Sequence, residues 1–470
     1  MMRFISGLIF IVIVLIFLLP SCRKDAFITD VNARINVSAD TVRFDTVFTT
    51  TGSVTQSLKI INSNSGKLLL SSIKLMGGSN SAYKLNINGV PKNELTNIEL
   101  AAEDSMYVFV SVTINPNANN LPFIVKDSIE ILFNGNKKYI QLEAYGQNAH
   151  FLRNHTISEN TIWPNDLPYV VIGSFFIDTA ISLTIDPGCK IYLHADAPII
   201  VDGSLIVNGN KNNEVIFRGD RLDEYYRDLP AGWPGIYFRN KSTDNVMRFA
   251  IITNAYQALA VQNPAENNKT KLTLHQCIID NAFENGILSI NSSLEADNTL
   301  ISNCGNNISI QAGGKYSFTN CTAASYSNSF MLHKTPVLQA NNFFIENGSI
   351  SSSDLDANFT NCIFWGDGGI VDDETVFEKK GTGIFNVTLN HCLIKVKTEP
   401  PTVTLNEVLK NQDPLFDNID VGKKLYDFRT TKNLSAPGID NGINTDFSKD
   451  LDDNPRISGT ATDLGCYEKQ

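Results

Sequence analysis

The chain has 470 residues, which is long enough for two or three domains or for one domain followed by an elongated repeat array. Its 43% content of hydrophobic residues is typical of a folded chain rather than a disordered one. The formal net charge of −11, without a basic stretch interleaved with aromatic residues, argues against nucleic acid as a partner.

The first residues have the layout of an export signal. Arg3 is followed by an apolar run over residues 4–19 and then by small residues. This run is shorter than the ~20 apolar residues that a membrane span needs. Its ending, LPSC at residues 19–22, resembles a bacterial lipobox, in which the cysteine is lipidated and becomes the first mature residue. Pro20 departs from the small or aliphatic residue that is usual there.

The lipobox resemblance implies a signal peptide over residues 1–21, lipidation of Cys22 and a tether over residues 22–29. An uncleaved N-terminal anchor is the alternative, and either arrangement would hold the protein on a lipid membrane facing an extracytoplasmic space. Residues 23–25 (RKD) resemble the export tags of some surface lipoproteins of Bacteroidota. We therefore expect a lipid-anchored protein at the outer membrane, on its periplasmic or cell-surface side.

Residues 30–148 are predicted to form an antiparallel β-sandwich. Runs such as SLKII (57–61), YVFVSVTI (107–114) and SIEILF (128–133) alternate apolar and polar residues with a period of two, and Asn, Gly and Pro separate them. Roughly 110 residues of such short strands suit an immunoglobulin-like domain. The order of the runs resembles the immunoglobulin-like domains of the abnormal-spindle and hydin type, which implies a spacer or docking module.

Residues 157–410 are predicted to form a solenoid of short strands. The runs 183–220 and 232–255 consist of β-rich segments separated by Asn and Gly, and both resemble coils of a right-handed parallel β-helix of the pectate-lyase-like superfamily. A single coil cannot bury its apolar face alone, so stacked coils share one continuous core. The expected fold class is all-β, an immunoglobulin-like sandwich followed by a right-handed parallel β-helix.

A cysteine preceded by Asn, Gln or His recurs in the predicted solenoid. It is found at Cys277, Cys304, Cys321, Cys362 and Cys392, with separations of 27, 17, 41 and 30 residues. Because solenoid repeats span about 20 to 50 residues, we interpret this kernel as a coil marker and the gap of 41 as two coils. Each cysteine is expected to point inward and to stack on the equivalent residue of the next coil.

The cysteines have three competing explanations. A buried free cysteine behaves as a small hydrophobe, which fits an inward slot. Without Cys22 seven cysteines remain, an odd number that cannot all pair, although neighbouring coils are close enough for one or two disulfides. Zinc would require close pairs such as C-x-x-C, and the sequence has none. A nucleophilic cysteine paired with His275 or His391 is a further alternative, but a histidine one or two residues before the cysteine along a strand cannot be assumed to reach the thiol.

Four motifs in the last 60 residues resemble the C-terminal end of the β-helix family that carries the choice-of-anchor Q domain. They are DPLF (413–416), SAPGIDNG (435–442), DLDDNPR (450–456) and DLGCYE (463–468). The resemblance implies that residues 411–470 fold back and cap the solenoid, as a repeat array requires.

A β-helix fold does not identify a reaction. Its polysaccharide lyases and glycoside hydrolases need clustered acids, or Ca²⁺ held by carboxylates near a basic residue. Arg239 and Arg248 lie near one predicted coil, but no acidic trio recurs at one strand position. The run from Asp450 resembles the start of a calcium loop, yet Pro455 and Ala461 replace the Gly and Glu that such a loop needs. We therefore expect no metal and no cofactor, and the sequence assigns no catalytic residue.

Two regions are candidates for a glycan contact because aromatic faces beside charged groups suit sugar rings. The candidate residues are Tyr225, Tyr226, Trp233, Tyr237 and Arg239 in the first region and Trp365, Asp367, Asp372 and Asp373 in the second. The structural alternatives are that Trp233 only seats the next coil and that the acidic loop is a solvated turn. The sequence thus predicts a binding or structural module directed at polysaccharide; the alternative hypothesis is a polysaccharide lyase or glycoside hydrolase that acts in a β-helix groove.

Overall fold

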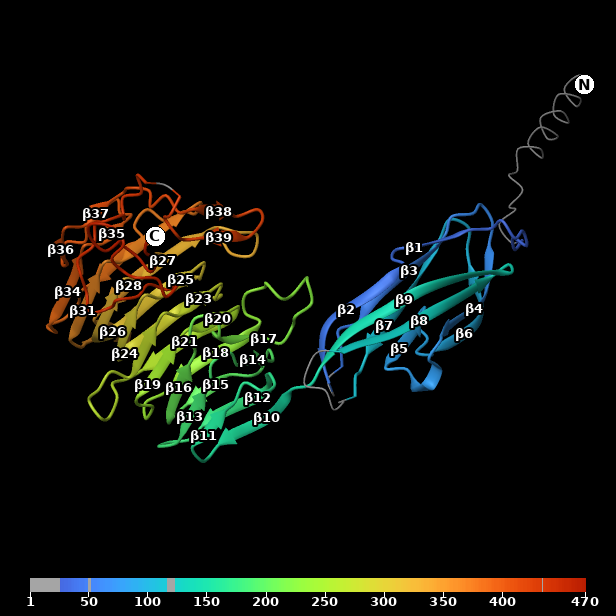
Figure 1. The fold of residues 1–470 in the computed structure, drawn as a ribbon, viewed down its shortest axis with the longest axis horizontal. Coiled ribbons are helices and arrows are strands. Elements are labelled where there is room, and N and C mark those ends of the chain that lie inside the picture. The colour runs from blue at the N-terminus through green and yellow to red at the C-terminus, as the bar shows by residue number, and fades with distance from the viewer. Residues whose placement is uncertain (1–25, 50–51, 116–122, 433) are drawn as a thin grey trace, which may run out of the picture. The chain divides into compact units, whose positions relative to one another are not determined.

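The computed structural model describes residues 26–49, 52–115, 123–432 and 434–470. The predicted export signal (1–21) and the predicted lipidation site Cys22 lie outside these residues. The chain divides into two compact units after Asn148 (Figure 1). Within the described residues, no helix has the length and apolar character that crossing a membrane requires.

The N-terminal unit consists of two antiparallel-type sheets with strand orders β1-β3-β7-β5 and β2-β9-β8-β4-β6, in which only β2 and β9 pair in parallel. Its elements are β1 (Ile35–Val37), β2 (Thr41–Phe48), β3 (Gln56–Asn62), β4 (Leu68–Leu75), the 3₁₀ turn η2 (Gly78–Asn80), β5 (Tyr83–Ile87), β6 (Glu94–Leu100), β7 (Ser105–Val112), β8 (Phe123–Phe133) and β9 (Asn136–Gln147). Alternate residues of β7, namely Val108, Val110 and Val112, are fully buried between the sheets. The period-two pattern therefore forms the sandwich that it predicts.

The C-terminal unit is a solenoid built on one sheet of 26 strands, all of whose pairings are parallel. Its strands are β10 (His150–Ile157), β11 (Thr161–Trp163), β12 (Tyr169–Ile177), β13 (Ser182–Ile185), β14 (Lys190–Leu193), β15 (Ile199–Val201), β16 (Ser204–Asn208), β17 (Val215–Gly219), β18 (Trp233–Phe238), β19 (Asn245–Arg248), β20 (Ala250–Thr253), β21 (Ala255–Gln262), β22 (Leu272–His275), β23 (Ile278–Asp280), β24 (Asn285–Asp297), β25 (Leu300–Ser302), β26 (Asn306–Thr319), β27 (Thr322–Tyr326), β28 (Leu338–Asn341), β31 (Leu355–Thr360), β32 (Ile363–Asp367), β33 (Thr375–Glu378), β34 (Phe385–Asn390), β35 (Leu393–Ile394), β36 (Thr404–Asn406) and β37 (Leu409–Lys410). Two antiparallel pairs lie outside this sheet: β29 (Phe343–Glu346) with β30 (Ser349–Ser352), and β38 (Asn418–Asp420) with β39 (Leu425–Asp427).

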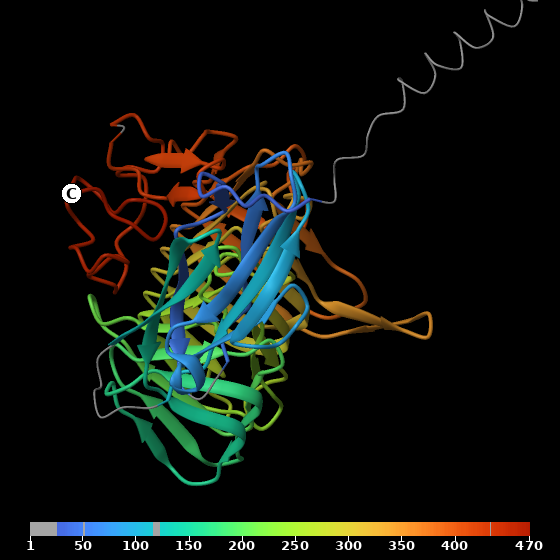
Figure 2. The ribbon, with the colours of Figure 1, turned by 90° about the vertical axis from the view of Figure 1, so that its right-hand side faces the viewer.

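The strands of successive coils lie side by side in three stacks (Figures 1 and 2). In one coil the chain passes from a first-stack strand such as β18 to a second-stack strand, β19, and then to a third-stack strand, β20, before it enters the next coil. The core consists of aligned residues: Val207, Met247 and Leu274 are direct neighbours in register and are all fully buried. The predicted fold class, a sandwich followed by a β-helix, is confirmed.

The corner between the second and third stacks turns on a residue with positive φ. This residue is Gln276, Asn298, Asn320, Asn361 and His391 in five successive coils, with φ between 46° and 54°. Asn tolerates this conformation better than most residues, because its short polar side chain makes local hydrogen bonds. The residue before the cysteine therefore supplies the turn, and its side chain points away from the core.

The residue after each of these turns points inward and forms a ladder. The strand registers align Cys277, Thr299, Cys321, Cys362 and Cys392 in consecutive coils, and all five side chains are at most 1% exposed. All seven cysteines of the described residues are free and buried. Burial raises the pKa of the Cys277 thiol to about 12, so the thiolate that a nucleophile needs does not form near neutral pH. The inward-slot interpretation is confirmed for these cysteines.

Two parts of the coil-marker interpretation were wrong. Cys304 follows Asn303 at a different corner, between the third-stack strand β25 and the first-stack strand β26. The 41 residues between Asn320 and Asn361 form one coil rather than two, since Thr322 pairs directly with Ile363. That coil is long because it holds an extended loop and the hairpin β29–β30, which stands away from the stacks (Figure 2).

The C-terminal tail lies along a side of the solenoid. It binds the outward amides of the turn ladder: Asn361 Nδ2 donates to the Ile443 carbonyl (2.8 Å) and Asn361 Oδ1 accepts from the Ile443 N–H (2.9 Å). Gln276 Nε2 donates to the Asp450 carbonyl (2.6 Å), and Arg456 donates to Asn298 Oδ1. The family resemblance led us to expect a cap, but these contacts follow successive coils along one flank.

The tail also covers the outer face of the third stack. Leu464 packs on Ile363 and Leu393, while Tyr467 and Cys466 join a second apolar cluster with Leu300. These strand residues point away from the solenoid core and would otherwise be exposed, so the tail supplies the apolar cover that they require.

We predict that all seven cysteines of the solenoid are reduced and protected. In the full-length chain carrying Cys22→Ser, a thiol reagent should find seven reactive thiols after denaturation and almost none in the native protein, because all seven are buried and the reagent cannot reach them. Fewer than seven thiols after denaturation without a reductant would reveal a disulfide.

We predict that Asn361 holds the tail. Asn361→Gly keeps the turn but removes both hydrogen bonds to Ile443, and it should lower the free energy of unfolding by about 1–3 kcal/mol. Asn361→Ala should cost about 1 kcal/mol more, because φ is 54° at this position. Urea unfolding measures both changes, and hydrogen exchange around residue 443 should accelerate in both variants. The exposed Asn358→Ala is the control; unchanged exchange at residue 443 would refute this role.

Candidate functional site

Three long loops of the solenoid lie at the corner where the third stack passes into the first, which we name the loop corner. Residues 220–232, 327–337 and 368–374 are long connections there. Between them lie three consecutive coils with short turns, at Asn254, at residues 281–284 and at residues 303–305. The long loops therefore flank a low floor formed by the short turns.

A cleft of about 240 Å³ lies on this floor. Its lining residues come from the loops, the turns and the C-terminal tail: Asp228, Asn254, Asp280, Asn281, Asn303, Asn328, Phe330, Lys423, Lys424 and Tyr426. It thus combines amides, carboxylates, ammonium groups and aromatic rings in one concave site, which is the composition of a site for a polar ligand with an apolar face.

The floor of the cleft is a second ladder of Asn residues with positive φ. Asn254, Asn281 and Asn303 have φ of 61°, 57° and 49°. Asn281 Nδ2 donates to Asn254 Oδ1 (2.8 Å) and to the carbonyl of Asp228 (3.1 Å), which ties the floor to the loop 220–232. The amides are therefore held in fixed orientations beneath the cleft.

Two carboxylates of the cleft have different surroundings. Asp280 accepts hydrogen bonds from Ser302 Oγ (2.7 Å) and Asn303 Nδ2 (3.2 Å), and burial raises the pKa of its carboxyl above the usual range. Asp228 is exposed on the loop 220–232 and pairs with Arg227 at 3.5 Å. The cleft thus holds one half-buried acid, Asp280, and one exposed acid, Asp228.

The far wall of the cleft is anchored by a buried pair. His333 Nε2 and Glu374 Oε1 are 2.8 Å apart, with side chains 2% and 0% exposed. Glu374 Oε2 also accepts from the Val337 N–H (3.3 Å). The pair joins the loop 327–337, which carries Asn328 and Phe330, to the loop 368–374.

The structure places Tyr225 and Tyr226 on the loop 220–232, as exposed side chains at 77% and 43%. Their rings meet edge to face with centroids 5.0 Å apart, and the Arg221 guanidinium lies 3.8 Å from the Tyr226 ring centroid. Both rings remain accessible to a ligand at the loop corner.

Tyr237 and Arg239 lie on the outer face of the first stack, in a shallow groove of about 350 Å³. Pro198, Ile200, Pro234 and Gln262 complete its lining. The Tyr237 hydroxyl donates to the Pro234 carbonyl (3.1 Å), and Arg239 Nε donates to Asp202 (2.9 Å). The groove is mainly apolar, with one guanidinium held at its edge.

The two tryptophans predicted to contact a glycan, Trp233 and Trp365, are buried. Their prediction as ligand-binding residues was therefore wrong. Trp233 is 1% exposed in the solenoid core and donates from Nε1 to the Thr253 carbonyl (2.9 Å), so it seats the next coil. Trp365 points out of the third stack but is 7% exposed, because the tail residue Leu464 packs beside it.

The acidic residues after Trp365 are exposed but do not converge. Asp367 pairs with Lys395 (3.5 Å) and Asp372 with Lys397 (3.2 Å). Asp373 accepts the N–H of Lys397 (2.6 Å), which fixes the neighbouring turn. Within the described ranges, no group of three or more His, Cys, Asp or Glu side chains could hold a metal ion.

Sequence reasoning missed an aromatic pair on the loop corner. Tyr256 and Phe283 are each 45% exposed, and their rings stack with centroids 5.7 Å apart. Both directly follow turns of the floor ladder, Tyr256 two residues after Asn254 and Phe283 two residues after Asn281. An aromatic residue repeated two positions after a recurring Asn-Ala was the signal that could have identified them.

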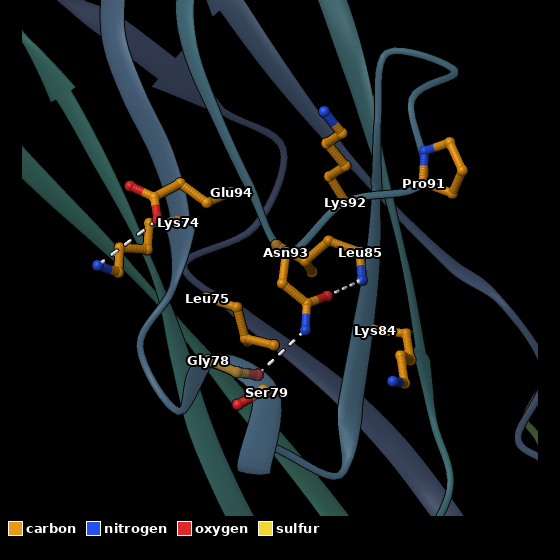
Figure 3. Close-up of a pocket in the computed structure, with 10 residues that line it drawn as sticks. All are labelled: Lys74, Leu75, Gly78, Ser79, Lys84, Leu85, Pro91, Lys92, Asn93 and Glu94. Carbon is orange, nitrogen blue, oxygen red and sulfur yellow. Dashed lines mark hydrogen bonds and ion pairs between the residues drawn. The ribbon is translucent and has the colours of Figure 1, made fainter.

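The N-terminal unit has a pocket of its own beside η2, with a volume of about 490 Å³ (Figure 3). Asn93 bridges its walls by donating to the Gly78 carbonyl (3.1 Å) and accepting from the Leu85 N–H (3.1 Å). Its lysines, Lys74, Lys84 and Lys92, point in different directions (Figure 3). They therefore do not focus positive charge on one point, and we do not assign a site there.

No family model matches the chain. No curated protein matches it either. Among solved structures, a family 123 glycoside hydrolase from Clostridium perfringens matches 24% of this chain at 12% identity with a TM-score of 0.17, and the match spans 26% of that enzyme.

Two further solved structures are similar over parts of the chain. The ASH/PapD-like domain 7 of human CEP192 matches 25% of this chain and 85% of its own length, at 10% identity and a TM-score of 0.17. The catalytic domain of a GH87 α-1,3-glucanase matches 75% of this chain and 87% of its own, at 9% identity and a TM-score of 0.20. These scores are too low to carry an argument about function.

We predict that the His333–Glu374 pair fixes the wall of the cleft. Glu374→Ala removes the partner of a buried imidazole and should lower the free energy of unfolding by about 2–4 kcal/mol, with faster hydrogen exchange in residues 327–337. The matched control is Asp372→Ala in the same loop, whose ion pair is 72% exposed on both sides and should change stability by less than about 1 kcal/mol. Equal effects of the two substitutions would contradict the prediction.

Proposed function

We propose that this protein is a membrane-anchored, extracytoplasmic glycan-binding module, with the loop corner as its binding surface. The observation that carries the proposal is the group of accessible aromatic rings at the loop corner, Tyr225, Tyr226, Tyr256 and Phe283. Anchoring through Cys22 at the outer membrane, facing the periplasm or the cell exterior, belongs to the same proposal and rests on the N-terminal sequence.

The chemistry of the loop corner supports a glycan ligand. A sugar ring presents an apolar face, which packs on an aromatic ring, and hydroxyl groups, which need donors and acceptors. The stacked pair Tyr256 and Phe283 offers aromatic faces, and the amides of Asn254 and Asn281, which bond to each other and to the loop 220–232, hold the adjacent floor in place. Because these groups come from rigid coils, little side-chain entropy is lost when they bind a ligand.

A glycoside hydrolase or polysaccharide lyase is the second candidate function, and one observation favours it. Glycoside hydrolysis uses two carboxyl groups, one of which has a raised pKa and acts as the acid. Asp280, whose pKa burial raises, and the solvated Asp228 line the same cleft. Release of reducing ends or unsaturated products from a glycan that the protein binds, and loss of that release in Asp280→Asn, would establish this second function in place of simple binding.

We predict that the aromatic pair contributes to glycan binding. Tyr256→Ala and Phe283→Ala should each weaken binding by about 3- to 10-fold, since an aromatic contact contributes about 0.5–1.5 kcal/mol. Affinity electrophoresis of the full-length chain against uronate and neutral polysaccharides, followed by calorimetry on the ligand found, measures the effect.

Two residues of equal exposure serve as controls for the aromatic pair. Tyr107 in the N-terminal unit and Phe344 on the hairpin β29–β30 are each 46% exposed, close to the 45% of Tyr256 and Phe283. Tyr107→Ala and Phe344→Ala should leave the affinity unchanged. If all four variants bind as the parent protein does, or if no polysaccharide binds, the proposal is wrong.

A further inference from the structure

The cleft lining carries two carboxylates, Asp228 and Asp280, and two ammonium groups, Lys423 and Lys424. Asp228 pairs with Arg227 (3.5 Å), and Lys423 pairs with Asp420 (3.0 Å) in the hairpin β38–β39. Lys424, the next residue, forms no ion pair with any carboxylate of the described chain. Among the described residues, the Lys424 ammonium and the Asp280 carboxylate are therefore the charged groups of the lining that form no ion pair.

Lys424 is held in position over the cleft. Its backbone has a φ of 55° at the tip of the hairpin β38–β39, and its N–H donates to the Val421 carbonyl (3.3 Å). Its Nζ lies 4.0 Å from the ring centroid of Phe330, which belongs to the opposite wall and is 38% exposed. A cation over an aromatic face keeps its N–H donors available to a further partner.

The cleft volume of about 240 Å³ is below the range of about 300–1,000 Å³ that is typical of sites for drug-sized ligands. This volume suits a single sugar residue rather than a long segment of a chain. Asn281, Asn303 and Phe330 are among the residues that line this cleft.

We propose that the cleft binds one anionic sugar residue of a glycan, with the Lys424 ammonium on its acidic group, assisted by Lys423. This inference rests on the proposed glycan-binding function and specifies the ligand of the same site. The acidic group is a carboxylate or a sulfate, which present the same negatively charged oxygens to an ammonium group. The C-terminal tail is then part of the binding site as well as a cover for the third stack.

Titration of the full-length chain with three monosaccharides tests this proposal. Glucuronate, glucose 6-sulfate and glucose have closely related rings and differ in the acidic group, which is a carboxylate, a sulfate or absent. Calorimetry or saturation-transfer NMR measures the affinity of the protein for each of the three sugars. At least one of the two anionic sugars should bind about tenfold more tightly than glucose, and added salt should weaken that binding.

The variant Lys423→Ala/Lys424→Ala should lower the affinity for the preferred anionic sugar by about tenfold and leave glucose binding unchanged. The chain offers a matched control in Lys379 and Lys380, a second adjacent pair in which Lys380 Nζ lies 4.1 Å from the ring centroid of Phe343. Lys379→Ala/Lys380→Ala changes the net charge by the same amount and should leave both affinities unchanged.

Each result has a distinct meaning. Equal losses in the two lysine variants would reflect the overall charge and would overturn the proposal, as would equal binding of all three sugars or no binding by any of them. If polysaccharide binding depends on Tyr256 and Phe283 but not on Lys423 and Lys424, the glycan-binding function stands and this inference fails. If no polysaccharide binds, the function itself fails.

Discussion

Five successive coils of the solenoid turn on one backbone residue with positive φ that is followed by one small buried side chain. In the coils that carry Asn320 and Asn361, the turn residue closes the corner between the second and third stacks, and Cys321 and Cys362 fill the space inside it. In earlier coils the aligned slot is filled by Cys189, Val215 and Ala250, and neighbouring coils lie about 4.8 Å apart. The pairing of a left-handed turn with a small apolar residue therefore keeps all three stacks in register.

The outward side chains of the positive-φ turn residues have different partners at two corners of the solenoid. Between the second and third stacks, amides such as Asn361 bind the backbone of the C-terminal tail, which then covers the outer face of the third stack. Between the third and first stacks, the amides of Asn254 and Asn281 form the floor of an open cleft. One structural device thus fixes the tail at one corner and prepares a polar surface for a ligand at the other.

The tail connects the two corners. Its last part follows the first amide ladder, while its hairpin β38–β39 places Lys424 and Tyr426 against the cleft at the second. The cleft therefore combines ammonium groups, aromatic rings and amides from segments that are far apart in the sequence. The surface candidates that sequence patterning identified, Tyr225 and Tyr226, stand on the loop that forms one flank of the same floor.

The sequence by itself determined the fold class, because alternation with a period of two and recurring Asn turns reflect local backbone preferences. It also favoured cysteines that point into the core, but it left one or two disulfides open, and the structure shows that all seven cysteines of the described residues are free. The sequence did not predict where each coil begins and ends, because loops of any length can be inserted without changing the strand pairing. The 41-residue interval between Asn320 and Asn361 is an example, since it forms one coil.

Only the tertiary structure decided which exposed-looking residues are accessible. The sequence predicts that Trp365 is an exposed aromatic residue at the end of a strand. Its side chain does point outward, but Leu464, almost 100 residues further along the chain, covers it. The cleft was equally invisible in the sequence, since Asp228, Asn281 and Lys424 are brought together by stacking and by the returning tail. Contacts across coils depend on register and on long-range packing, and neither leaves a local pattern in the chain.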